Sequence, residues 1–125
     1  AFVNGESISV SKTSKLEDVQ ASYGDVTGFE KAGYPESLNN LNKFIWRARG
    51  MGDFCSYMLV AEGAIDLGLD THVQPYDVAP LKLIVEEAGG RTTSFDGKDS
   101  FREPTFVSTN GLIHDEIIKI IISGK

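Results

Sequence analysis

Apolar residues recur at helical spacing in four segments of the chain. The clearest segment is residues 78–88. Asp77 precedes it as a candidate N-cap, and the glycine pair 89–90 ends it. A second segment begins at the pair Gly52-Asp53 and is stopped by Gly63. The expected helices cover residues 35–45, 53–62, 78–88 and 114–123.

Short runs between these helices predict strands. Asn4-Gly5 is a hairpin signal, because both central residues of a type I′ turn need a positive φ. A strand is expected at residues 64–69, with Asp70 at its end. The other expected strands cover residues 19–23, 91–94 and 105–108, and the hairpin arms cover 1–3 and 7–10. Strands that alternate with helices predict an α/β fold in which helices cover a sheet.

Length and charge narrow the class of protein. The 125 residues are 41% apolar and 24% charged, which is typical of one globular domain over residues 1–125. Twelve Lys and Arg against 18 Asp and Glu give a net charge of −6, which argues against nucleic acid or an anionic membrane as the main partner. No run approaches the roughly 18 apolar residues that a membrane span needs.

The cysteine count and the first residues indicate where the protein acts. Cys55 is the single cysteine, which excludes an internal disulfide, and its place in an apolar helix predicts an inert, buried thiol. We therefore expect a soluble domain of a reducing compartment, the cytoplasm. Because Ala1 is neither an initiator Met nor the start of a signal peptide, we also expect the chain to be cut from a longer one.

Taken singly, the residues that could carry chemistry have simple structural interpretations. Asp77 is explained as a helix cap, and Asp70 as a solvated carboxylate at a strand end. His72 and His114 lie among polar residues, and no third side chain completes a zinc spacing or a nucleophile triad.

Taken together, the order and spacing of these residues resemble one family. Residues 76–80, Tyr-Asp-Val-Ala-Pro, are followed by an apolar helix that ends in Glu-Ala-Gly-Gly at 87–90. This pattern resembles the second signature of the inositol monophosphatase family, and the hairpin around Asn4-Gly5 and the pair Thr109-Asn110 are similar to the family as well. The resemblance implies a mixed sheet covered by helices, the C-terminal half of the inositol-monophosphatase-like fold.

The resemblance also implies the chemistry of a magnesium-dependent phosphomonoester hydrolase. In the family, carboxylates bind two or three Mg²⁺ ions, which hold the phosphate and activate a water. By matched position Asp77 is the catalytic metal ligand, with its second oxygen free to accept a backbone N–H. The family's first signature, Asp-Pro-x-Asp-Gly-Thr/Ser, which supplies most of the metal ligands, is absent from these residues. We therefore expect the 125 residues alone to be inactive, and to act with an N-terminal half of their own chain in a homodimer.

Four positions match the part of the family's pocket that binds the rest of the substrate. They are Arg49, Gly52, Asp53 and Asp70. Residues 52–57 and 110–116 look closer to the histidinol-phosphatase branch than to the inositol phosphatases. Histidinol phosphate carries an ammonium and an imidazole, to which Asp53 and Asp70 offer charge-assisted acceptors. The resemblance thus favours histidinol phosphate, with inositol phosphate or a broad range of small phosphorylated metabolites as alternatives.

Two interpretations from other classes stay open. The chain could be a binding or regulatory module that kept the fold without the chemistry. The isoleucine-rich segment 113–122 could form an oligomer face, against the simpler interpretation that this helix packs on its own sheet or on the missing half.

Overall fold

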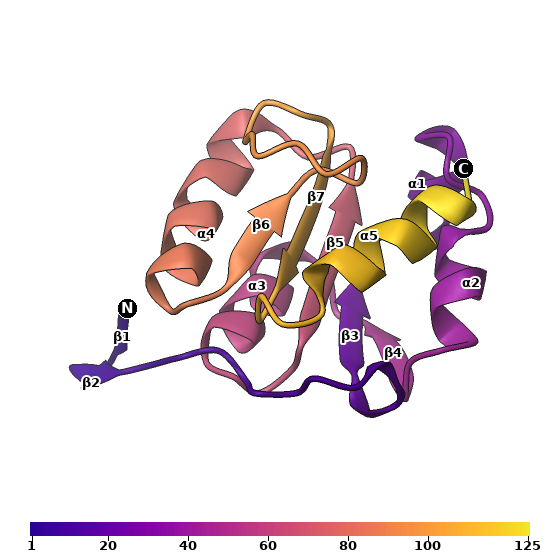
Figure 1. Ribbon diagram of the computed structural model, residues 1–125. Helices are drawn as coiled ribbons and strands as arrows, with labels where there is room; N and C mark the ends of the chain where they lie inside the picture. Colours follow the sequence, from indigo (N-terminus) through magenta and orange to yellow (C-terminus); the bar gives the residue numbers. More distant parts are fainter.

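A five-stranded mixed sheet runs through the centre of the molecule (Figure 1). Its strands are β3 (Gln20–Tyr23), β4 (Arg47–Gly50), β5 (Leu67–Thr71), β6 (Arg91–Thr93) and β7 (Thr105–Thr109). Their order across the sheet is β4-β3-β5-β7-β6. β3 is parallel to β4 and β5, whereas β7 is antiparallel to β5 and β6. The computed structural model describes all 125 residues, and it confirms the mixed sheet that was expected.

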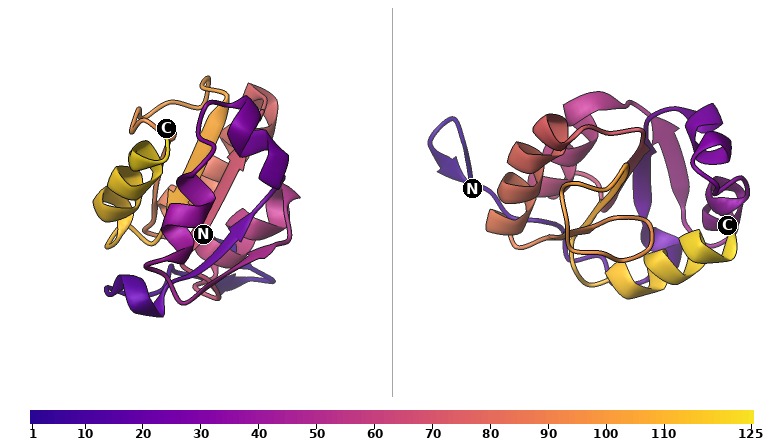
Figure 2. Two further views of the ribbon diagram at one scale, coloured as in Figure 1. Left: turned by 90° about the vertical axis from the view of Figure 1, so that its right-hand side faces the viewer. Right: turned by 90° about the horizontal axis from the view of Figure 1, so that it is seen from above.

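Helices cover both faces of the sheet, which gives three layers (Figure 2). The helices of one face are α1 (Val26–Lys31), α2 (Ser37–Asn42) and α5 (His114–Ser123), and those of the other are α3 (Asp53–Ala61) and α4 (Pro75–Glu87). Because successive strand residues point to opposite faces, Val107 joins the core beneath the first group and Phe106 the core beneath the second. The longest helix, α4, has 13 residues, and no helix combines the length and apolar character that a membrane crossing requires.

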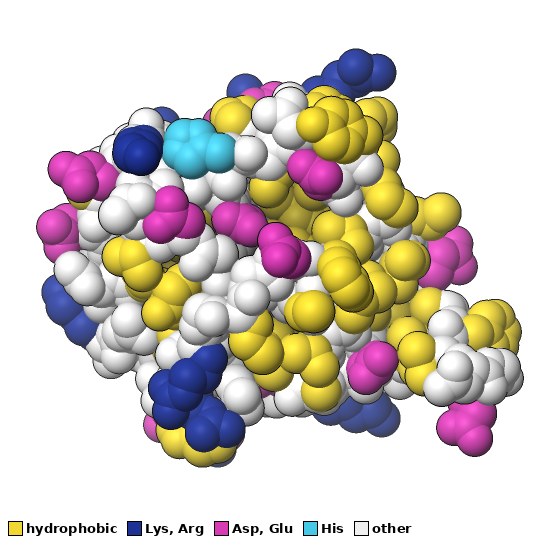
Figure 3. Space-filling model, turned by 180° about the vertical axis from the view of Figure 1, so that it is seen from behind, with side chains coloured by type: hydrophobic (Ala, Val, Ile, Leu, Met, Phe, Trp, Pro, Cys, Tyr) yellow, Lys and Arg dark blue, Asp and Glu magenta, His cyan; other side chains and the backbone are white.

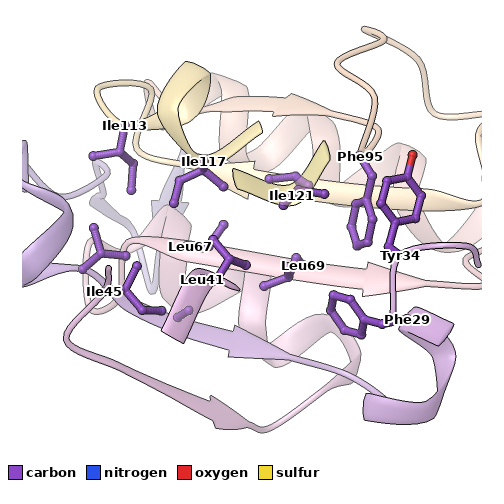
Figure 4. Packing of buried hydrophobic residues seen from close by; sticks show 13 residues of the cluster. Phe29, Tyr34, Leu41, Ile45, Leu67, Leu69, Phe95, Ile113, Ile117 and Ile121 are labelled. Carbon is purple, nitrogen blue, oxygen red and sulfur yellow. The ribbon is translucent and has the colours of Figure 1, made fainter. Parts of the chain in front are cut away.

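The isoleucines of the last helix belong to the core of this chain (Figure 4). Ile113, Ile117 and Ile121 are fully buried and point toward the strands, in one cluster with residues of α1, α2, β3 and β5. Ile122 is left 43% exposed. The apolar face of α5 therefore packs on its own sheet, so the simpler of the two interpretations is confirmed.

The second core depends on a close approach between α3 and β5. The ring of Tyr57 packs against Phe106 with 5.0 Å between centroids. It also lies over Gly68, where an added Cβ would be 3.2 Å from the ring. Glycine at this position of β5 leaves the room that the tyrosine occupies.

A short hairpin at the N-terminus projects from the body of the molecule (Figure 2). It pairs β1 (Phe2–Val3) with β2 (Glu6–Ser7) around a turn in which Asn4 has φ 50° and Gly5 has φ 82°. These two positive φ angles confirm the hairpin expected from the sequence.

Several expected elements differ from those of the structure. The strand expected at residues 64–69 begins at Leu67 and continues to Thr71, so Asp70 lies inside β5 and not after it. The helix expected at residues 35–45 is only α2, and Phe44 beyond it is exposed. α1, β4 and the 3-10 turn η1 (Leu16–Asp18) had not been predicted.

Two side chains lie in environments other than those expected. Cys55 is exposed on α3, so the prediction of a buried thiol is wrong. The next two residues of the helix, Ser56 and Tyr57, occupy its inner side. His114 is 1% exposed at the start of α5, and its ring nitrogens hydrogen-bond the hydroxyls of Thr93 and Thr109, so its polar neighbours are inside the protein.

Candidate active site

A cavity of about 460 Å³ lies where β5 ends and where α3 and α4 begin. Ligands of open α/β sheets bind at this place, outside the carboxyl ends of the strands. In the face shown in Figure 3, acidic side chains gather around a hollow with hydrophobic walls. The cavity, called the acidic cavity below, is lined by Asp53, Phe54, Tyr57, Asp70, Thr71, His72, Val73, Asp77, Val78 and Leu81.

Asp53 reaches the acidic cavity because of an unusual turn before α3. Gly52 has φ 68° and Asp53 itself has φ 52°. Positive φ is a conformation that glycine adopts freely, and that aspartate tolerates better than most residues. The Gly52 N–H donates to the carbonyl of Tyr23 at 3.2 Å, which holds the turn against the end of β3. The backbone conformation of Gly52 thus orients Asp53 toward the acidic cavity.

Asp70 lies half-buried at the floor of the same cavity. Its Oδ1 accepts a hydrogen bond from the Thr71 N–H at 2.8 Å. A Cβ built on Gly24 would lie 2.3 Å from Oδ1, so the missing side chain of Gly24 leaves the space that this carboxylate fills. Burial raises the pKa of Asp70, and the negative charges of Asp53 and Asp25 raise it further.

Asp77 has a position other than the one expected. α4 begins at Pro75 after Gln74 as N-cap, so Asp77 lies inside the first turn and the prediction that it caps the helix is wrong. Its carboxylate accepts no hydrogen bond within the chain, whereas one oxygen had been expected to bind a backbone N–H. Both oxygens of Asp77 therefore remain available to a ligand. The neighbouring Tyr76 is 78% exposed, so its ring does not pack within this chain.

The charge of the acidic cavity is unbalanced. Asp53, Asp70 and Asp77 all line it, no Lys or Arg does, and none of the three carboxylates forms an ion pair. Carboxylate oxygens are the donors that Mg²⁺ prefers. No three His, Cys, Asp or Glu side chains of the chain come close enough together to hold a metal ion. The carboxylates of the acidic cavity are thus the right type of ligand for a hard cation such as Mg²⁺. They are too few and too far apart to hold the ion without further ligands.

The structure brings together three of the five predicted site residues. Asp53, Asp70 and Asp77 share the acidic cavity, and Gly52 shapes its rim through the turn. Arg49 lies exposed on the edge strand β4, where its guanidinium donates to the Ala48 carbonyl at 3.2 Å, and it does not line the cavity.

Sequence reasoning missed the aromatic part of this site. Phe54 and Tyr57 lie in the segment 52–57 that resembles the histidinol-phosphatase branch, but neither was assigned to the site, and both line the acidic cavity. Phe54 is exposed, and only Tyr57 is buried. The available signal was their position one and four residues after Asp53, which places them at the start of the helix that opens on the site.

Comparison with known proteins agrees with this geometry. The sequence pattern of the inositol monophosphatase family matches residues 1–122, and the chain therefore belongs to that family.

Three relatives show how close the similarity is. A histidinol-phosphatase of Mycobacterium tuberculosis is 40% identical over 117 residues, which are 94% of this chain and 45% of that protein. A fructose-1,6-bisphosphatase/inositol-1-monophosphatase of Thermotoga maritima is 34% identical over 123 residues, covering 97% of this chain and 46% of that protein. In a solved structure, an IMPase of Thermotoga maritima has a TM-score of 0.86 at 33% identity, covering 98% of this chain and 47% of that one. The chain spans about half the length of the relatives it matches.

Proposed function

We propose that this chain is the substrate-side half of a magnesium-dependent phosphatase that hydrolyses a small phosphomonoester. The observation that carries the proposal is the unpaired carboxylate of Asp77. In this member of the family, Asp77 faces a cavity that holds two further carboxylates and neither Lys nor Arg. Such a cavity repels an anionic substrate unless a metal ion offsets its charge.

Mg²⁺ is the cation proposed for this site. When bound, it lowers the pKa of a water and neutralises charge on the phosphoryl oxygens. Asp77 supplies one ligand, and the other ligands of the two or three ions come from protein outside these 125 residues, since the chain holds no group of three ligating side chains. The 125 residues alone are therefore expected to be inactive.

The chain's own contribution is to place the phosphate and to bind the rest of the substrate. α3 and α4 both begin at the acidic cavity, and neither has a side chain that caps its first N–H groups. Free N–H groups at helix N-termini favour a phosphate. Asp53 and Asp70 then lie beside the ester's organic part, whereas the predicted role of Arg49 rests on the family resemblance alone.

Histidinol phosphate is the substrate we propose. Its ammonium and imidazole groups match the negative charge of Asp53 and Asp70, and the histidinol-phosphatase of Mycobacterium tuberculosis shares 40% identity with the chain. The second candidate is an inositol phosphate, which the Thermotoga maritima relative favours by its name. We further propose that the complete protein forms a homodimer and acts in the cytoplasm.

The test is phosphate release by the complete protein with and without Mg²⁺. Asp77→Asn keeps the size of the side chain and removes its charge, so we expect it to lower kcat/KM by at least about 100-fold. Asp18→Asn is the matched control, because Asp18 is exposed next to the opposite end of β3. Activity that needs no Mg²⁺ and survives Asp77→Asn would contradict the proposed chemistry, and no activity on any phosphomonoester would favour a non-catalytic binding module.

A further inference from the structure

Tyr57 has a buried hydroxyl without a hydrogen-bond partner. The residue is 3% exposed, and its hydroxyl oxygen is among four buried polar side-chain atoms that find no partner in the chain. A buried polar group left unpaired is costly, so an orphaned hydroxyl indicates a partner that comes from elsewhere.

The side chain of Tyr57 leans toward the end of α3 at which the acidic cavity lies. Side chains of a helix lean toward its N-terminus, and α3 begins at the cavity with Asp53. The Tyr57 ring contacts Phe106, the residue that pairs with Asp70 across β5 and β7. Tyr57 also lines the cavity. Its hydroxyl therefore lies at the level of Asp70, beneath the two exposed carboxylates.

The other orphaned atoms do not share this position. Thr71 lines the acidic cavity, but its Oγ1 faces α1, since a Cβ built on Gly28 would lie 2.1 Å from it. Arg47 and Ser108 are not part of the lining. Of the four residues with an orphaned atom, only Tyr57 and Thr71 line the acidic cavity, and the orphaned atom of Thr71 faces α1.

We propose that Tyr57 is a specificity-determining residue, whose hydroxyl hydrogen-bonds the nitrogen-bearing end of the substrate at the floor of the acidic cavity. The inference rests on the proposed function and adds a residue to it. A phenol hydroxyl is both donor and acceptor, so it can pair with an imidazole nitrogen or an ammonium N–H. Asp53 and Asp70 attract the positive charge of the same end of the substrate, and the hydrogen bond to Tyr57 fixes the orientation of that end. A substrate without a nitrogen at that place leaves the hydroxyl unpaired and binds less well.

The experiment uses the complete protein with Tyr57→Phe and compares two substrates. We expect kcat/KM for histidinol phosphate to fall about tenfold more than that for glycerol 2-phosphate, mainly through KM, because one hydrogen bond to a buried group is lost. Calorimetric binding of L-histidinol should weaken by a similar factor. Tyr34→Phe is the control, since Tyr34 is a buried tyrosine of the other core, and it should leave the substrate ratio unchanged.

The melting temperature of the ligand-free protein separates this role from a structural one. Tyr57→Phe removes a hydroxyl with no partner and keeps the ring contacts with Phe106, so the melting temperature should stay the same or rise. A lowered melting temperature, or an equal loss for both substrates, would overturn the inference, because the hydroxyl would then have a partner within the protein.

The proposed function and this inference can fail separately. If the unaltered protein does not hydrolyse histidinol phosphate, the proposed substrate is wrong and the role of Tyr57 falls with it. If the protein hydrolyses histidinol phosphate and Tyr57→Phe leaves the substrate ratio unchanged, the inference alone is wrong.

Discussion

The buried His114 makes the stability of this fold sensitive to mild acid. Its Nε2 lies 2.8 Å from the hydroxyl of Thr93, which itself donates to the Ser94 carbonyl. That hydroxyl must therefore accept, and Nε2 carries the ring proton. Nδ1 lies 2.9 Å from the hydroxyl of Thr109. Because Nδ1 then carries no proton, it accepts from this hydroxyl, which itself accepts from the Gly111 N–H. A second ring proton, on Nδ1, would end the hydrogen bond that the Thr109 hydroxyl donates to the ring and leave that hydroxyl's own proton without an acceptor in this network.

The magnitude follows from the pKa of His114. Burial, with the positive charge of Arg91 as the next cause, lowers it from 6.5 to about 4. The folded state excludes a proton that the unfolded chain binds below pH 6.5, so the stabilisation is complete above that pH and is lost as the pH falls toward 4. By linkage, the free energy of unfolding should decrease by about 2 kcal/mol at pH 5 and about 3 kcal/mol at pH 4 from this group alone.

The assay is urea unfolding of the complete protein between pH 7.5 and 4, compared with His114→Gln. The variant cannot titrate, so its loss of stability over this range should be smaller than that of the unaltered protein by about 3 kcal/mol. His72→Asn is the control, because His72 is the other histidine and is exposed with φ 56°, which asparagine tolerates. Identical pH profiles for His114→Gln and the unaltered protein would refute the reasoning.

Three further predictions concern packing and the site. Gly24→Ala places a Cβ 2.3 Å from Asp70 Oδ1, so the carboxylate must move, and KM for histidinol phosphate should rise about tenfold in steady-state assays. Ile117→Ala should lower the free energy of unfolding by about 2–5 kcal/mol in urea titrations, whereas Ile122→Ala, at a 43% exposed position, should change it by less than about 1 kcal/mol; equal effects would contradict the packing of α5. Thr71→Val removes a buried hydroxyl without a partner, so thermal unfolding should show equal or greater stability.

How far the sequence predicts the fold depends on how strongly each segment is patterned. The helix at residues 114–123 has the same bounds in the structure, because one face of it is almost purely isoleucine. α1 was missed because it is six residues long and contains Gly28, which leaves the space that the Thr71 hydroxyl fills. β4 was missed because Arg47–Gly50 is a polar edge strand without alternation. These two elements depend on contacts with residues distant in sequence, which no local pattern records.

The site was predicted in part for a similar reason. Asp77 and Asp70 were found by family resemblance, and the structure adds that they share one cavity with Asp53. Tyr57 was hidden, since its helical spacing is that of any core residue. Only the structure shows that its hydroxyl has no partner and that its ring packs on Phe106, the residue paired with Asp70. A residue that is both packed and functional gives no separate signal in one sequence.

The most direct test of the account is the ratio of kcat/KM for histidinol phosphate to that for inositol monophosphate, measured with Mg²⁺ on the complete protein. We expect the ratio to exceed one, and to fall by about tenfold or more in Asp53→Asn, which removes a charge from the acidic cavity without changing its shape. A ratio below one that Asp53→Asn leaves unchanged would contradict the claim that the acidic cavity selects a cationic substrate.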